Sequence, residues 1–493
     1  MKLAFEKSSL NANTADAIAV FLHGDKSLFS SEIVALVRQL GVRIPAADRG
    51  DFTGKEGESV VLYVPHARQT RRYVLVGLGE RKKLSLERYR RSGAVAAKCA
   101  RSLKAESLAM FVPLIATEFQ SVVSALAEGA FLALYKFDKY ISKKSDSPPN
   151  LQTITVCAES SARVKQGIQA VRWTKTICEA TYLARDLANA PGNEIYPQTL
   201  AEAAKLSAER CGYTAKILDE REIKDAGMGG VLGVSQGSVH PPRFVILEYG
   251  KKQRRPVVLV GKGVTFDTGG ISIKPSAGMA EMKMDMSGAA AVIGAFEAVA
   301  RLKLPVHIVG LIPIVENMPS GSSIRPGDII RHHNGKTSEV DNTDAEGRLI
   351  LADALAFAEK FKPAAVIDLA TLTGACVVAL GHHASGMLGN DASLMTKLKR
   401  AGESTYERVW QLPLYDEYET LIRSDVADVK NVGGRWAGTI TAAWFLKKFI
   451  GSYKWVHLDI AGTAMLEEDG DYTQKGASGV GVRLLTEFLR RWK

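Results

Sequence analysis

Short apolar runs alternate with longer amphipathic stretches along most of the chain. Runs rich in valine, isoleucine and leucine predict β-strands, and stretches whose apolar residues recur every three or four positions predict helices. In the first part of the chain the expected strands are 17–22, 59–64, 73–77 and 153–158, with helices at 30–40 and 84–102. Farther along, the expected strands are 243–248, 256–261 and 306–311, with helices at 197–211 and 287–302. Such alternation predicts an α/β fold in which crossover helices join mainly parallel strands.

Breaks in this pattern divide the chain into two domains. Its 493 residues favour the same division, because a single core rarely grows that large. Residues 1–160 are expected to form an N-terminal α/β domain that includes a polar loop at 136–150. A linking helix at 161–190 then ends in the break APGN at 190–193. Residues 191–493 are expected to form the second α/β domain, the catalytic one, a mainly parallel sheet with helices on both faces.

The composition is that of an ordinary globular protein, with 46% hydrophobic and 24% charged residues. No apolar run approaches the ~20 residues that cross a bilayer, and the N-terminus lacks the apolar core of a signal peptide. The five cysteines are scattered and form no C-x-x-C pair, which argues against a disulfide framework and against structural zinc. We therefore expect a cytoplasmic protein without a membrane partner.

The net charge of +11 is concentrated in the N-terminal part of the chain. Between Arg68 and Lys104, twelve basic residues face only Glu80 and Glu87. A basic patch of this kind is compatible with DNA binding. The cluster also follows an amphipathic pattern, so a solvated basic face is the favoured interpretation and DNA binding is the alternative.

The segment NTDAEGRL at 342–349 concentrates charge where an extended stretch turns into a helix. Asp344 and Glu346 are two residues apart, so in an extended backbone their carboxylates leave on the same face. A divalent cation would relieve the repulsion between them, because hard metals bind converging carboxylate oxygens. A solvated turn ahead of the helix is the alternative.

Two segments upstream supply further charged candidates. Lys262 and Asp267 lie in VGKGVTFDTGG, which directly follows an apolar strand but fits neither the dinucleotide nor the phosphate-loop glycine spacing. A salt bridge is the alternative for this pair. Asp285 precedes the helix at 287–302, where Ser287 is a plausible N-cap and helix capping is the alternative role for Asp285.

These charged residues together match the needs of one kind of site. The full set comprises four acids and three cations: Asp267, Asp285, Asp344, Glu346, Lys262, Lys274 and Arg348. A two-metal hydrolytic site requires bridging carboxylates, an activated water and fixed positive charge near the developing oxyanion. The chain contains no H-E-x-x-H motif, so histidine ligands of the zincin kind are not expected.

The sequence motifs of the chain resemble those of the leucyl aminopeptidase family, the cytosol aminopeptidases. NTDAEGRL at 342–349 matches the signature of that family. Further co-linear blocks agree with it: VGKGVTFDTGG from 260, KMDMSGAA from 283, DLATLTGA from 368, SDVAD from 424 and HLDIAGTAM from 457. The similarity covers essentially all of residues 160–493 and fits the N-terminal part more loosely.

The resemblance implies a role for each candidate residue. One metal site would be built from Lys262, Asp267, Asp285 and Glu346. The other would use Asp267, Asp344, Glu346 and a backbone carbonyl. Lys274 would polarise the scissile carbonyl, and Arg348 would hold a bicarbonate ion that serves as general base. The pocket for the substrate side chain would involve Met282, Thr371, Gly374 and Met465.

The same resemblance implies a metal-dependent aminopeptidase that removes N-terminal residues, preferably leucine and other apolar ones, from peptides. The reaction would be a two-metal hydrolysis with a bridging water. An oxygen-rich site accepts Mn²⁺ or Mg²⁺ as well as Zn²⁺, so the metal stays open. A dipeptidase narrowed to small or Cys-Gly substrates is an alternative. The family likeness also implies a homohexamer.

Overall fold

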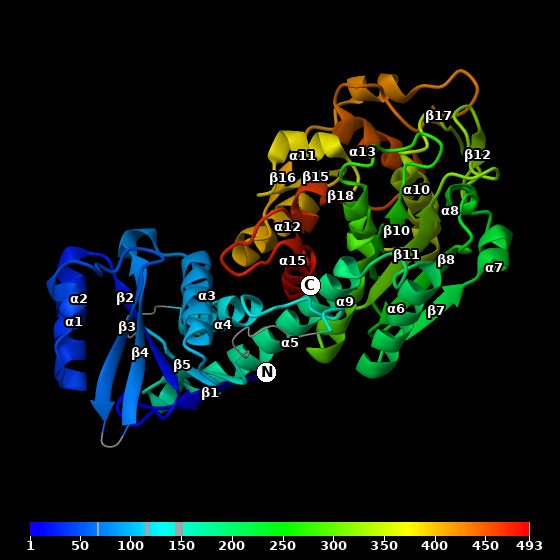
Figure 1. The fold of residues 1–493 in the computed structure, drawn as a ribbon. Coiled ribbons are helices and arrows are strands. Elements are labelled where there is room, and N and C mark those ends of the chain that lie inside the picture. The colour runs from blue at the N-terminus through cyan, green and yellow to red at the C-terminus, as the bar shows by residue number, and fades with distance from the viewer. Residues whose placement is uncertain (67–68, 114–117, 143–150, 493) are drawn as a thin grey trace. The chain divides into compact units, whose positions relative to one another are not determined.

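The computed structural model describes residues 1–66, 69–113, 118–142 and 151–492 (Figure 1). Arg68 and the end of the loop expected at 136–150 lie outside these residues. The chain forms two compact units. The first comprises residues 1–179 and 468–474, and the second comprises residues 180–467 and 475–493.

The first unit is built on a six-stranded sheet whose strands are mostly parallel. Its order is β1 (Lys2–Lys7), β6 (Thr153–Ala158), β5 (Ser107–Phe111), β2 (Ala17–His23), β4 (Gln69–Gly79) and β3 (Ser59–His66). Only β3 and β4 pair antiparallel. Helices α1 (Lys26–Leu40) and α2 (Pro45–Asp48) lie to one side of the sheet, and α3 (Leu86–Ser102) and α4 (Phe119–Leu132) to the other (Figure 1).

Helix α5 (Val164–Asn189) contributes to both units, and a short 3-10 turn at Ser161–Arg163 precedes it. The segment 468–474 belongs to the first unit although it comes late in the chain. Within that unit the Tyr472 hydroxyl donates to the Glu87 carboxylate at 3.0 Å, and Lys98 Nζ donates to the Gly470 carbonyl at 2.9 Å. These bonds attach the late segment to helix α3.

The second unit contains a nine-stranded sheet with a parallel centre. Its order is β16 (Val409–Gln411), β15 (Ser385–Gly389), β18 (Trp455–Asp459), β14 (Ala365–Ala370), β9 (Val257–Gly261), β11 (Ile308–Asn317), β8 (Arg243–Tyr249) and β7 (Thr214–Leu218), with β10 (Gly263–Asp267) paired to β11. Strands β18, β14, β9 and β11 run parallel to one another. The α/β fold with a mainly parallel sheet is thus confirmed.

Helices cover both faces of this sheet. On one face α9 (Ser287–Arg301) packs on β9 and β14, with α6 (Pro197–Cys211) and α15 (Val482–Arg490) beside it. On the other face α10 (Glu346–Ala358) packs on β9 and β11, between α8 (Gly229–Ser235) and α13 (Gly438–Phe449). Strands β9 and β14 are buried along their whole length, which explains their continuous apolar sequences.

Shorter elements complete the second unit. They are α7 (Glu220–Asp225), α11 (Gly374–Leu380), α12 (Ala392–Thr405), α14 (Ala461–Ala464), β12 (Ile329–Arg331), β13 (Thr337–Glu339), β17 (Val429–Lys430), β19 (Met465–Leu466), β20 (Gly476–Ala477) and the 3-10 helix η3 (Met279–Met284). Within the described ranges, no helix combines the length and the apolar character needed to cross a bilayer.

Two differences from the sequence expectations lie in β11 and at the start of α9, both in the second unit. Strand β11 ends at Asn317 rather than at 311. It continues past Pro313, which interrupts the apolar pattern, because β8 pairs with it as far as Ile314 and β10 as far as Asn317. Ser287 is the first residue of α9, not its N-cap, and its hydroxyl donates to the Met284 carbonyl at 2.6 Å. The N-cap is Met286 and no side chain makes a capping hydrogen bond there, so the alternative role of Asp285 as a helix cap is wrong.

Candidate metal centre and active site

The carboxyl ends of the central strands of the second unit open on one cavity of about 630 Å³. Open α/β sheets place their ligands at this edge. Every site residue expected from the sequence lines the cavity: Lys262, Asp267, Lys274, Met282, Asp285, Asp344, Glu346, Arg348, Thr371, Gly374 and Met465. The fold therefore brings four separate parts of the chain, around 262–285, 344–348, 371–374 and 465, to a single site.

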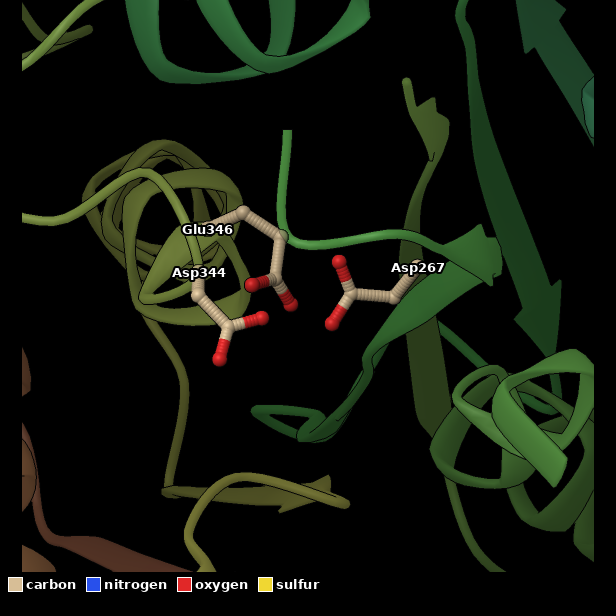
Figure 2. A group of neighbouring side chains, drawn as sticks. All are labelled: Asp267, Asp344 and Glu346. Carbon is tan, nitrogen blue, oxygen red and sulfur yellow. The ribbon is translucent and has the colours of Figure 1, made fainter. Parts of the chain in front are cut away.

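Three carboxylates converge at the centre of this site (Figure 2). Asp267 is the last residue of β10, Asp344 lies in the turn before α10, and Glu346 is the first residue of that helix. One oxygen from each lies within 4.8 Å of the others. The backbone at 344 is a turn rather than extended, because the Asp344 N–H donates to Asn342 Oδ1 at 2.8 Å. The expected extended geometry is thus wrong, although the side chains do meet.

Two lysines lie between the carboxylates. Lys262 Nζ lies 2.7 Å from Asp285 Oδ1 and 2.9 Å from Glu346 Oε1. Lys274 Nζ lies 2.7 Å from Asp267 Oδ2 and also pairs with Asp344. Each ammonium group thus bridges two carboxylates.

The second residue of α10 must be small for this arrangement. A Cβ at Gly347 would lie 2.4 Å from Lys262 Cε and 2.7 Å from its Nζ. The absence of a side chain at Gly347 leaves room for Lys262 to reach Glu346. The glycine of the NTDAEGRL segment therefore serves packing at the site rather than backbone conformation.

Burial shifts the titration of these groups. Burial and the Glu346 charge raise the pKa of Asp267, and burial with the Asp267 charge raises the pKa of Asp344. Burial also raises the pKa of Asp285 well above its usual value, against the effect of Lys262. Burial alone would lower the pKa of Lys262, but Asp285 and Glu346 raise it above its ordinary value. Lys262 is therefore a protonated ammonium group beside these carboxylates.

The donor set fits divalent cations. Asp285 Oδ2 and Glu346 Oε1 are buried and have no hydrogen-bond partner within the described chain. Glu346 Oε1 is near Lys262 Nζ but not in a hydrogen-bonding direction. Buried carboxylate oxygens are normally satisfied, and oxygen-rich clusters suit hard divalent metals. The set of candidate metal ligands found among the described residues is Asp267, Asp344 and Glu346, and it includes no histidine.

Arg348 lies in the first turn of α10 with its side chain buried. One terminal nitrogen donates to the Asn431 carbonyl at 2.5 Å, and Nε has no partner in the described parts of the chain. Burial lowers the pKa of Arg348 to about 10, so the guanidinium remains protonated at neutral pH. It thus offers fixed positive charge beside the cavity.

The side chain of Asn431 holds the turn before α10 by hydrogen bonds to its backbone. Its side-chain oxygen accepts from the Asp341 and Asn342 N–H groups at 2.8 and 3.2 Å. Its amide nitrogen donates to the Asn342 carbonyl at 2.7 Å. The sequence reasoning missed Asn431, and its position after the short strand β17 gives no pattern that would have singled it out.

Asp459 organises the apolar wall of the cavity. Its Oδ2 accepts from the Thr373 hydroxyl at 2.6 Å, and its Oδ1 accepts from the N–H groups of Leu372 and Ala461 at 3.2 Å. These bonds fix the segments that follow β14 and β18, which lead to Thr371 and to Gly374 at the start of α11, and to Met465 at the start of β19. Asp459 was not among the candidates either, although it lies in the HLDIAGTAM block.

This geometry defines a class of protein. A cluster of carboxylates and lysines, most of them buried, at strand ends and at a helix start, beside an apolar wall and a buried guanidinium, is typical of metal-dependent hydrolases. The model of the cytosol aminopeptidase family's catalytic domain matches residues 182–486, and that of its N-terminal domain matches residues 30–144. The chain belongs to this family and is a metal-dependent aminopeptidase.

Individual relatives agree with this assignment. The chain is 46% identical over 494 residues to the probable cytosol aminopeptidase of Geobacter sulfurreducens, covering 99% of each chain. It is 49% identical to that of Geobacter sp. (strain M21), covering 90% of this chain and 91% of the relative. Among solved structures, the bottromycin maturation enzyme BotP in complex with Mn has a TM-score of 0.86 at 34% identity, covering 97% of this chain and 99% of BotP. A mutant of tomato leucine aminopeptidase has a TM-score of 0.87 at 32% identity, covering 100% of this chain and 97% of that protein.

Proposed function

We propose that this aminopeptidase removes leucine and other apolar N-terminal residues from peptides by a two-metal reaction. The observation that carries the proposal is the convergence of Asp267, Asp344 and Glu346, with oxygens within 4.8 Å of one another, beside an apolar cavity wall. The wall that would receive the substrate side chain contains Met282, Thr371, Gly374, Ala464 and Met465. Methionine adapts to apolar side chains of differing shape.

We assign the metal ligands as the family resemblance implies. Lys262, Asp267, Asp285 and Glu346 would hold one ion, and Asp267, Asp344, Glu346 and a backbone carbonyl would hold the other. Bound there, two divalent ions would act as Lewis acids and lower the pKa of a shared water. Mn²⁺ or Zn²⁺ is the proposed cofactor, with Mg²⁺ as an alternative, and the Mn bound by BotP favours manganese.

The chain's own cations would complete the chemistry. Lys274 is partly exposed to the cavity, so its ammonium group can donate a hydrogen bond to the oxygen of the scissile carbonyl as negative charge develops there. Arg348 would hold a bicarbonate ion through donors that the protein leaves unused. Bicarbonate would accept the proton of the attacking water, as a general base does.

The proposal is tested with purified protein on leucine p-nitroanilide, with Mn²⁺ and after complete removal of metal by a chelator. We expect activity only with metal, and none from N-acetylated leucine substrate, because a free α-amine is required. Asp267→Ala should be inactive at any metal concentration. Full activity of the chelated wild-type protein, or of Asp267→Ala, contradicts the two-metal reaction.

Substrate range needs a separate measurement. A panel of dipeptides compared by kcat/KM distinguishes a broad leucyl aminopeptidase from a dipeptidase narrowed to small or Cys-Gly substrates. The apolar wall favours leucine over glycine by the burial of its side chain, which is worth about 1.5–3 kcal/mol. A preference for Cys-Gly over Leu-Gly would reject the leucyl assignment.

DNA binding by the N-terminal unit is a second proposal, based on the twelve basic residues between Arg68 and Lys104. Within the cluster between Arg68 and Lys104, several basic side chains are engaged inside the protein. Arg88 pairs with Glu56 at 2.9 Å, and Arg90 with Glu87 at 3.3 Å. Fewer charges are then left for a polyanion. Duplex binding that weakens steeply as salt rises would support an interface, and no shift of a DNA probe at low salt would reject it.

We also propose a homohexamer and a cytoplasmic location, both on the family resemblance. All five cysteines, each in the described part of the chain, are free thiols, which suits a reducing compartment. Light scattering of the purified protein tests the assembly. A monomer mass would reject the hexamer.

A further inference from the structure

We propose that Asn317 is a positioning residue for the metal centre, holding Asp267 and the turn before α10 in one arrangement. This inference rests on the proposed function, because it concerns the carboxylate assigned as a shared metal ligand. Asn317 is the last residue of β11 and is 2% exposed. It lies outside every segment that the sequence singled out.

The side chain of Asn317 joins the two halves of the site. Its amide nitrogen donates to Asp267 Oδ1 at 2.8 Å and to the Thr343 carbonyl at 3.1 Å. Asp267 ends β10, whereas Thr343 directly precedes Asp344 in the turn. One amide group therefore uses both of its N–H donors to connect a carboxylate upstream with the turn downstream.

The orientation of the amide follows from its neighbours. A carboxylate oxygen and a carbonyl oxygen both face one end of the group, so that end must be the nitrogen. The other end packs against Gly270, where a Cβ would lie 2.8 Å from Asn317 Oδ1. Gly270 has a φ of +65°, in the left-handed region that favours glycine. The amide is thus held on both sides.

The backbone of Asn317 reinforces this arrangement. Strands β10 and β11 are parallel, and an irregularity between Val264 and Asp267 brings Asp267 opposite Asn317. The Asn317 carbonyl then accepts from the Thr268 N–H at 3.0 Å and from the Thr268 hydroxyl at 2.8 Å. The residue that follows Asp267 is therefore anchored to the same position in β11.

The two oxygens of the Asp267 carboxylate have different partners. Oδ1 accepts from Asn317 and from the Gly269 N–H at 2.9 Å. Oδ2 receives no such bond from Asn317 and lies 2.7 Å from Lys274 Nζ. Asn317 thus fixes Oδ1 by a hydrogen bond, whereas Oδ2 stays available to Lys274 or to a metal ion. Hydrogen bonds of this kind orient a ligand before the metal arrives, and their loss typically weakens metal binding about 10–100-fold.

The test is a calorimetric titration of the metal-free protein with Mn²⁺. Asn317→Leu removes both donors at similar volume, and Asn317→Ala removes them without risk of a clash at Gly270. We expect the Mn²⁺ dissociation constant to rise about 10–100-fold in each. We also expect kcat for leucine p-nitroanilide to recover as Mn²⁺ is raised, which a general loss of stability would not produce.

Asn13→Ala is the matched control. Asn13 is also a buried asparagine that ties a turn, accepting from the Ala15 N–H at 3.0 Å, but it lies in the first unit. Its variant should bind Mn²⁺ as the wild type does. Unchanged Mn²⁺ affinity in the folded Asn317 variants would overturn the inference and leave the proposed function standing. A wild-type protein that binds no divalent metal would overturn the proposed function itself.

Discussion

Lys262 Nζ lies 2.7 Å from Asp285 Oδ1, and the two side chains are only 4% and 8% exposed. The same ammonium group contacts Glu346, whose side chain is 2% exposed. Lys262 therefore provides the positive charge that keeps two buried carboxylates together. This pairing makes the stability of the metal-free protein depend on a residue that is also a proposed metal ligand.

Lys262→Met should destabilise the metal-free protein. Removing one partner of a buried ion pair leaves an uncompensated charge and costs about 3–5 kcal/mol. Urea-induced unfolding in the presence of a chelator measures the loss. Lys454→Met is the control, because Lys454 pairs with Asp391 while 56% exposed, and such pairs contribute little. Equal stability of the two variants would contradict the role given to Lys262.

Gly347→Ala should reduce Mn²⁺ affinity and activity although alanine favours helices by about 1 kcal/mol over glycine. The new methyl group would lie 2.4 Å from Lys262 Cε and displace that side chain. Calorimetric titration with Mn²⁺ and a leucine p-nitroanilide assay measure both effects. Gly321→Ala is the control, because no atom lies within 4 Å of a Cβ there. Wild-type metal affinity in Gly347→Ala would show that Lys262 is not held against the helix in solution.

Arg348→Lys should lower kcat while leaving Mn²⁺ affinity unchanged. Arg348 donates to the Asn431 carbonyl and is assigned to the bicarbonate base rather than to a metal. General-base catalysis typically contributes 10²–10⁴-fold, so we expect a loss of at least about 10²-fold. Stimulation by added bicarbonate should also disappear in the variant. A fall in Mn²⁺ affinity alongside the fall in kcat would mean that Arg348 positions the metal ligands rather than the bicarbonate base.

Asp459→Asn should weaken discrimination between leucine and alanine substrates. The variant cannot accept all three bonds from Leu372, Thr373 and Ala461, so the loops of the apolar wall lose their common anchor. We expect the ratio of kcat/KM for leucine over alanine p-nitroanilide to fall about tenfold. Asp391→Asn is the control, since Asp391 accepts from the Leu394 N–H outside the cavity. An unchanged ratio would leave Asp459 with a purely structural role.

Cys157 and Cys376 should be unreactive toward a thiol reagent in the native protein. Burial raises the pKa of each thiol to about 12. The thiolate is the reactive form, and at pH 8 only about 10⁻⁴ of each thiol is ionised. Labelling at pH 8 with mass analysis should find both unmodified until urea is added. Fast native labelling of Cys376 would indicate opening of helix α11 beside the cavity.

Much of the fold could be predicted from local pattern. The strands at 17–22, 153–158 and 243–248 and the helices at 197–211 and 287–302 lie within a residue or two of those observed. The strand at Lys2–Lys7 was missed because Lys2, Glu6 and Lys7 leave only three consecutive apolar residues in it. The end of β11 was misplaced because Pro313 and Glu316 break its apolar run, and only pairing with two neighbouring strands keeps it extended.

For the candidate site, too, some residues could be identified from the sequence and others could not. Residues whose chemistry stands out in sequence, such as Asp267, Asp344 and Glu346, were identified because carboxylates at strand ends and helix starts are informative without coordinates. Asn317, Asn431 and Asp459 were not identified as site residues. Their side chains act by hydrogen bonds to the backbone of distant segments, and asparagine and aspartate are too common at the ends of elements to indicate such a role.

The sequence by itself determined the order and type of the main elements, the carboxylate and lysine groups available, and the family, because periodicity and motifs are local properties of the chain. Tertiary structure alone decided that Lys262 lies between Asp285 and Glu346, that Gly347 must be small, and that Asn317 joins Asp267 to the turn before Asp344. Those relationships depend on strand register and on helix packing across the sheet. Both are set by the burial of many apolar side chains at once, which no short segment encodes.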